Sequence, residues 1–197
     1  MPELVATPGQ TIGPFFGYAL PYPGDRELVP RGAASSVRLH GYVYDGGGNG
    51  VEDALLEIRQ ADASGAVPVT EGSLHRGGYR FTGWGRSSTG TFGHYWFSTL
   101  EPGPVRPGGA PFFAVVVSAR GLLNRLFTRI YLPADDAVLA ADPLLSTLDA
   151  TERRALVAVR DADGGLRFDL HLQGPSQTPF LTFPGHSVVL ENVKGAP

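Results

Sequence analysis

The chain has 197 residues, a formal net charge of −3 and no cysteine. This composition excludes disulfides and thiolate metal sites, and the mild negative charge argues against nucleic acid or an anionic membrane as a partner. Its 27 glycines and 17 prolines, together with 42% hydrophobic residues, are typical of one folded domain with many turns. The opening residues contain no basic and apolar leader, so we expect a cytoplasmic location.

The first segment is an apolar arm, Thr7 to Tyr22, joined to the rest by a polar link. Its prolines and glycines argue against any helix, while its aromatic residues are too numerous for a solvated tail. Such an arm must pack on its own domain or on a neighbouring subunit. We assign residues 1–36 to an arm and link that pack on a partner subunit, and residues 37–197 to the globular domain.

The first strands follow from alternating apolar and polar residues. Val37 to Tyr44 alternates clearly, Asp45 to Gly50 is a glycine-rich turn, and Ala54 to Gln60 returns as the next strand. The loop-rich middle contains two weaker strands, near Tyr79–Thr82 and Tyr95–Thr99.

The central element is Phe112 to Val117, six consecutive apolar residues that predict a strand covered on both faces. A second β-prone run, Leu126 to Leu132, follows it. Arg120 lies between the two runs, and a guanidinium buried at the end of an apolar strand needs an anion opposite it. That anion is an internal carboxylate or the carboxylate of a ligand. Residue type alone favours the internal carboxylate.

The C-terminal half contains the one helix signal. Within Asp142 to Leu156, the segment Asp149-Ala-Thr-Glu152 predicts the start of a short helix. Asp161 to Gly165 predicts a hairpin turn between strands at Ala155–Val159 and Leu166–Leu172. The chain is therefore predicted to be all-β, a β-sandwich of mostly antiparallel strands with long loops and one short helix.

Several short motifs occur in an order that resembles one family, the intradiol ring-cleavage dioxygenases. The resemblance is strongest to the α-type chains of the members that are built from two kinds of subunit. It covers about Thr7 to Phe183 and implies a β-sandwich, in agreement with the strand pattern. The motifs are Gln10–Pro14, Gly41–Asp45 with Leu56–Asp62, Ser118–Gly121, Thr128–Tyr131, Asp142–Pro143 and Arg167–Gly174.

The resemblance also implies what this chain lacks. Catalytic chains of the family hold ferric iron with two histidines and two tyrosinates, donors that favour Fe(III). Here Phe112 and Ala114 stand at the histidine positions and Val105 at one tyrosine position, while Tyr79 lies loosely at the other. The resemblance therefore implies no metal ligand and no catalytic residue in this chain, with Fe(III) bound by a partner β subunit. The remaining histidines show no ligand spacing: His40, His75, His94, His171 and His186.

The resemblance implies a substrate-binding role instead. Thr11, Gly13 and Pro14 of the arm, together with Arg120, match positions that complete the pocket of the iron-bearing subunit. The implied reaction is the O2-dependent, intradiol cleavage of 3,4-dihydroxybenzoate to 3-carboxy-cis,cis-muconate, in the catabolism of aromatic compounds. A Gly-Pro pair allows backbone to approach a flat ring, and an arginine favours a carboxylate. For Thr11 a simple turn hydrogen bond stays an equal alternative, as does an internal ion pair for Arg120.

Two other classes of function stay open. The chain could be a binding or scaffolding sandwich without a part in catalysis, or a dioxygenase with its own, unrecognised metal site. The missing histidines argue against the second, and the apolar arm with Arg120 argues against the first.

Overall fold

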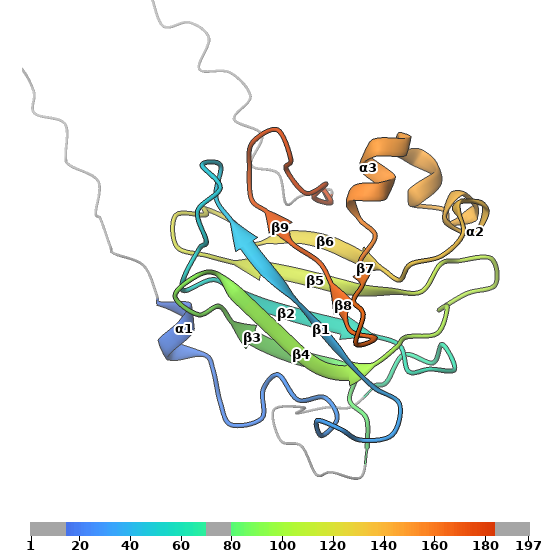
Figure 1. The fold of residues 1–197 in the computed structure, drawn as a ribbon, viewed down its shortest axis with the longest axis horizontal. Coiled ribbons are helices and arrows are strands. Elements are labelled where there is room, and N and C mark those ends of the chain that lie inside the picture. Colours follow the sequence, from blue (N-terminus) through green and yellow to red (C-terminus); the bar gives the residue numbers. More distant parts are fainter. Residues whose placement is uncertain (1–14, 70–79, 184–197) are drawn as a thin grey trace, which may run out of the picture.

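Two β-sheets pack face to face in the computed structural model, which describes residues 15–69 and 80–183 (Figure 1). The first sheet contains, in spatial order, β4 (His94–Leu100), β1 (Ser36–Tyr44), β8 (Leu166–Arg167) and β7 (Val159–Arg160), with β9 (Leu170–His171) also paired to β1. The second sheet contains β3 (Trp84–Ser88), β2 (Leu55–Gln60), β5 (Phe112–Ser118) and β6 (Leu126–Tyr131). The predicted all-β sandwich is confirmed. Its only parallel pairings among the described strands are those of β1 with β8 and β9.

Five predicted strands are present, including the weaker one near Tyr95–Thr99, and no end differs from its prediction by more than one residue: β1, β2, β4, β5 and β6. The weak strand predicted near residues 79–82 is wrong where it can be judged, because residues 80–82 are not in a strand. The strand of this region is β3, whose sequence WGRSS has no apolar alternation. Its Gly85 leaves room for Leu28, whose Cδ1 would lie 2.3 Å from a Cβ added at that glycine.

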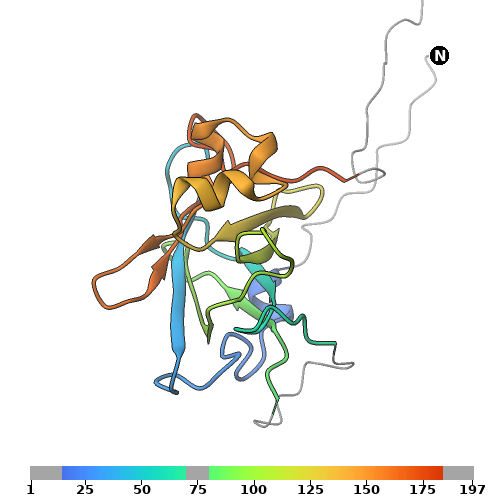
Figure 2. The ribbon, with the colours of Figure 1, turned by 90° about the vertical axis from the view of Figure 1, so that its right-hand side faces the viewer.

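The helix signal is confirmed in α3 (Ala150–Ala155), where Asp149 and Glu152 form a capping box. The structure adds helices that the sequence did not predict: α1 (Phe16–Ala19), α2 (Asp136–Ala141) and the 3-10 turn η1 (Leu145–Thr147). α2 and α3 lie together at one edge of the sandwich (Figures 1 and 2). The strand predicted for Ala155–Val159 is mostly wrong: α3 extends to Ala155, and only Val159 of that range lies in a strand, β7.

The prediction that the arm contains no helix is wrong for α1. This helix is a single turn, and Gly17 lies inside it. The Gly17 N–H donates to Asp53 Oδ1 at 2.5 Å, so a contact with the sandwich stabilises a turn that helix propensity alone disfavours. The earlier part of the arm lies outside the described residues.

The core fills the space between the sheets, and its largest fully buried members include Leu39, Ile58, Phe97 and Phe113. A smaller cluster lies under α2 and α3, around Tyr131, Leu139, Leu145 and Leu156. The polar link also contributes, since Leu28 is buried in the main core. The division at residue 36 and the packing of residues 1–36 on a partner stay predictions.

Strand β5 differs from the expectation that both its faces are covered. Phe113, Val115 and Val117 are buried in the core, but the alternate residues on the outer face are only half-buried. Three of the six apolar residues therefore face the core, and the other three form an apolar surface on the outer side of the sheet.

The structure explains why the motif Gly41–Asp45 begins with a glycine. A Cβ added there would lie 1.8 Å from the Phe168 carbonyl oxygen, so only glycine permits β1 to pass this close to the chain between β8 and β9. The same oxygen accepts a hydrogen bond from the Tyr95 hydroxyl at 2.6 Å. Burial strongly raises the pKa of Tyr95, which keeps this donor protonated.

Candidate functional site

Arg120 lies two residues beyond the end of β5 and is exposed, not buried as the sequence suggested. Its guanidinium carbon lies 5.2 Å from the centre of the Phe15 ring. Within residues 15–69 and 80–183 it forms no ion pair, so the internal carboxylate partner favoured by residue type is absent from that part of the chain. A cavity of about 390 Å³ opens beside it, between the α1 region and the loops around Asp53 and Gly90.

The start of the described chain is held against this cavity by specific contacts. Gly17 is bound to Asp53, which adopts the left-handed backbone region at φ 61°. Arg86 Nη1 donates to the Leu20 carbonyl at 2.8 Å. Phe15 is thereby placed beneath Arg120. Of the predicted substrate-binding residues, only Arg120 can be placed, because Thr11, Gly13 and Pro14 lie outside the described residues.

The positions that match the family's histidine ligands lie together on the outer face of β5. Phe112 and Ala114 are two residues apart on one strand and therefore point the same way. Neither side chain has an atom that can bind a metal, and Val105 is an exposed, apolar residue as well. The residues present therefore do not fit a ferric iron here. Among the described residues, no cluster of three or more histidine, aspartate or glutamate side chains could hold a metal ion.

Two motifs that carry the resemblance meet beside this face. Arg129 Nη1 donates to the Tyr131 hydroxyl at 3.1 Å, and that hydroxyl donates to Asp142 Oδ1 at 3.1 Å. Burial is the main cause that raises the pKa of Tyr131 to about 12, so the phenol stays protonated and can donate. Asp142 is 1% exposed and also accepts three backbone N–H groups. This Asp142 cluster joins the beginning and end of the β5–β6 pair to η1.

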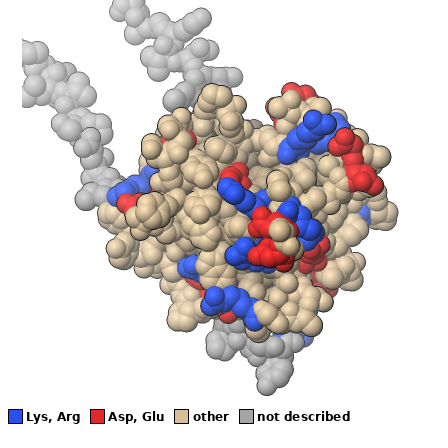
Figure 3. Space-filling view, viewed as in Figure 1, with Lys and Arg blue, Asp and Glu red and all other residues tan. Residues whose placement is uncertain are grey.

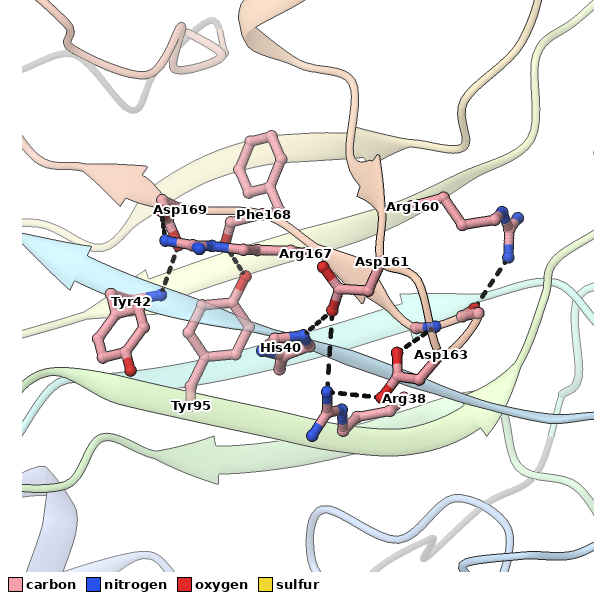
Figure 4. A network of polar contacts seen from close by, with 12 residues as sticks. Arg38, His40, Tyr42, Tyr95, Arg160, Asp161, Asp163, Arg167, Phe168 and Asp169 are labelled. Carbon is pink, nitrogen blue, oxygen red and sulfur yellow. Dashed lines mark hydrogen bonds and ion pairs between the residues drawn. The ribbon is translucent and has the colours of Figure 1, made fainter.

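A polar network on the outer face of the first sheet was not foreseen from the sequence (Figure 4). His40 Nε2 and Asp161 Oδ2 lie 2.6 Å apart, and Arg38 pairs with Asp163 at 3.2 Å. These partners are more than 120 residues apart in the chain, so no local signal could join them. Figure 3 shows charges of both signs gathered over this face. The network ties β1 to the β7–β8 turn, which is a structural role.

Among the neighbours of that network, His94 lies 6.0 Å from His40 between ring centres. Burial and the neighbouring His40 lower the pKa of His94, which favours its neutral form. His40 and His171 occupy strand positions, as expected. His75 and His186 lie outside the described residues.

Known proteins similar to this chain decide its family. The protocatechuate 3,4-dioxygenase alpha chain of Burkholderia cepacia is 39% identical, in an alignment that covers 92% of this chain and 99% of the relative. The corresponding alpha chain of Pseudomonas putida is 34% identical and covers 91% and 98%. The chain belongs to the intradiol ring-cleavage dioxygenases, as an alpha-type chain. The family resemblance inferred from the motifs is thus confirmed. The enzyme class is confirmed as well, because the relatives are subunits of oxidoreductases.

Other matches agree with this family. The protocatechuate 3,4-dioxygenase beta chain of B. cepacia is 31% identical over 73% of this chain and 66% of the relative. The dioxygenase domain of a carbohydrate-binding fusion protein from Streptomyces sp. SirexAA-E superposes with a TM-score of 0.57 at 27% identity, over 85% of this chain and 98% of that domain. Catechol 1,2-dioxygenase from Acinetobacter sp. ADP1, at 19% identity and a TM-score of 0.53 over 74% and 55% of the two chains, shares the fold. No protein-family model matches the chain.

None of the helices in the described ranges has the length and apolarity that a membrane crossing requires.

Proposed function

We propose that this chain is the iron-free α subunit of a heteromeric protocatechuate 3,4-dioxygenase and acts in the cytoplasm. The observation that supports this most is the outer face of β5, where Phe112 and Ala114 stand in place of two ligands. Ferric iron held by a partner β subunit supplies the activation of the catechol toward dioxygen. The alpha and beta chains among the relatives support such a pairing.

The role of this chain in the complex is to complete the substrate pocket. Arg120 presents an exposed guanidinium whose ion-pairing capacity the described residues leave unused. A planar fork of N–H donors suits the carboxylate of 3,4-dihydroxybenzoate, and the Phe15 ring holds the guanidinium plane in place. Thr11, Gly13 and Pro14, just before Phe15, are proposed to approach the ring of the same substrate. The product of the completed site is 3-carboxy-cis,cis-muconate.

Replacing Arg120 with lysine tests this role. In the complex with a β-type partner, Arg120→Lys is expected to keep the iron content but to raise KM for 3,4-dihydroxybenzoate by an amount worth roughly 1–3 kcal/mol, because the forked pair with the carboxylate is lost. Catechol has no carboxylate, so its KM should change far less. Steady-state kinetics on both substrates give the ratio, in which a general loss of folded enzyme cancels.

The matched control is Arg125→Lys, an exposed arginine of the same β5–β6 loop. We expect it to leave both KM values unchanged. Equal KM increases for both substrates in Arg120→Lys, together with a lower melting temperature, would instead assign Arg120 a structural role.

A further inference from the structure

The outer face of the second sheet contains a groove of about 540 Å³ in which two arginines flank an alanine. Strand register places Trp84, Arg59, Ala114 and Arg129 side by side on β3, β2, β5 and β6. We call this feature the arginine groove and define it by Arg59, Ala114 and Arg129. Its apolar walls come from side chains in the adjoining rows of the sheet and from the segment that follows β9: Phe112, Val116 and Phe127, and Phe183.

Both guanidiniums lack a carboxylate partner among the described residues. Arg59 Nη2 donates to the Pro68 carbonyl at 2.9 Å. The guanidinium carbon of Arg129 lies 4.0 Å from the centre of the Phe112 ring. Glu57 is the acid closest by register, one row away, but it is bound to Arg86 at 2.7 Å. Asp142 reaches Arg129 only through the Tyr131 hydroxyl.

The groove therefore places positive charge above an apolar floor. Arg129 is half-buried and Arg59 is exposed. The half-buried Arg129 guanidinium gains free energy when an anion replaces the water it has lost, and Arg59 adds a second positive charge at the rim. Neighbouring positions across a sheet are about 5 Å apart, so Arg59 and Arg129 can reach the same anion only if the residue between them is small. Ala114 meets that condition.

The shape and lining narrow the class of anion. An inorganic anion would pair with the arginines but has no apolar surface, so it would leave the rings of the groove in water. A flat ring, in contrast, packs against Phe112 and Phe127 while its carboxylate lies between the arginines. We propose that the arginine groove binds a small, planar aromatic carboxylate through this chain's own residues, without a metal.

Calorimetric titration of the full-length chain with 4-hydroxybenzoate tests the proposal. We expect saturable binding of one ligand per chain at millimolar concentrations. Cyclohexanecarboxylate has the charge but no flat ring, and benzamide has the ring but no charge, so both should bind at least about tenfold more weakly. Inorganic phosphate should not compete. The titration needs neither iron nor dioxygen, so its outcome is independent of the Arg120 experiment.

Variants locate the site. Arg59→Gln and Arg129→Gln should each weaken binding about tenfold or more, since each removes a charge-assisted pair. Ala114→Leu keeps every charge but fills the floor, and it should abolish binding. Because Ala114 points outward, circular dichroism and thermal unfolding should show an unchanged fold. Arg154→Gln, on the exposed side of α3, is the control and should bind like the native chain.

Three results would overturn the proposal. The first is the absence of saturable binding to the native chain, and the second is equal binding by Ala114→Leu. The third concerns assembly. In the complex with a β-type partner, Ala114→Leu should reduce the number of ligands bound by one per copy of this chain. An unchanged number would mean that the arginine groove binds no ligand in the assembled enzyme, and the proposal would fail.

Discussion

Purified without a partner subunit, the chain is expected to be colourless, to contain no stoichiometric iron and to cleave no catechol. The reason is the outer face of β5, where Phe112 and Ala114 offer no donor to a metal. Val105 offers none either. Co-expression with a β-type partner should give a red complex, because charge transfer from tyrosinate to ferric iron absorbs visible light. Metal analysis measures the iron content, and oxygen uptake measures the cleavage activity. We expect activity in the complex and none in the chain alone.

A stricter version restores only part of the ligand set. The double substitution Phe112→His, Ala114→His returns two imidazoles to one strand face, where both side chains point outward. Without two tyrosinates the site still lacks the hard anionic donors that hold Fe(III), so the variant should stay uncoloured with iron. A red native chain with about one iron per molecule would contradict the proposed function and favour a metal site of the chain's own.

Several features were predictable because their signals are local. The alternation in β1 and the apolar run of β5 specify strands whatever they pair with, and the capping box at Asp149 specifies the start of α3. The absence of the two histidine ligands could also be predicted from the sequence, since Phe112 and Ala114 lie in one short motif. Their common face then follows from the period of a strand.

The rest depends on contacts that the chain makes at a distance. β3 carries no apolar alternation, because Gly85 leaves its space to Leu28. Helix α1 depends on a hydrogen bond from Gly17 to Asp53, 36 residues away. The arginine groove is a product of register across four strands, which no single segment records.

Arg120 illustrates the same limit. The sequence placed it at the end of an apolar strand and suggested burial with an internal carboxylate. β5 ends at Ser118, however, and Arg120 already lies in the exposed loop that follows. Its neighbour is Phe15 from the arm, which the sequence connected to it only through the family resemblance. The structure thus brings together the loop and the end of the arm, while the substrate role of both stays proposed.

Asp142→Ala is expected to have the largest effect on stability. The Asp142 carboxylate is buried and accepts hydrogen bonds from the Tyr131 hydroxyl and from the N–H groups of Ala110, Leu144 and Leu145. Alanine would leave these donors buried without an acceptor, at a cost of roughly 3–5 kcal/mol in the free energy of unfolding. For a chain of this size that corresponds to a fall of about 6–20 °C in melting temperature.

The controls separate lost hydrogen bonds from lost charge. Asp142→Asn keeps one acceptor oxygen, so its loss should be intermediate. Asp136→Ala removes an acid of α2 whose ion pair with Arg154 is long, at 3.9 Å, and mostly exposed. It should change the free energy of unfolding by no more than about 0.5 kcal/mol. Chemical denaturation of the three variants orders them. If Asp142→Ala were as stable as Asp136→Ala, water would have to reach the four donors, and the Asp142 cluster would not be what holds η1 against the β5–β6 pair.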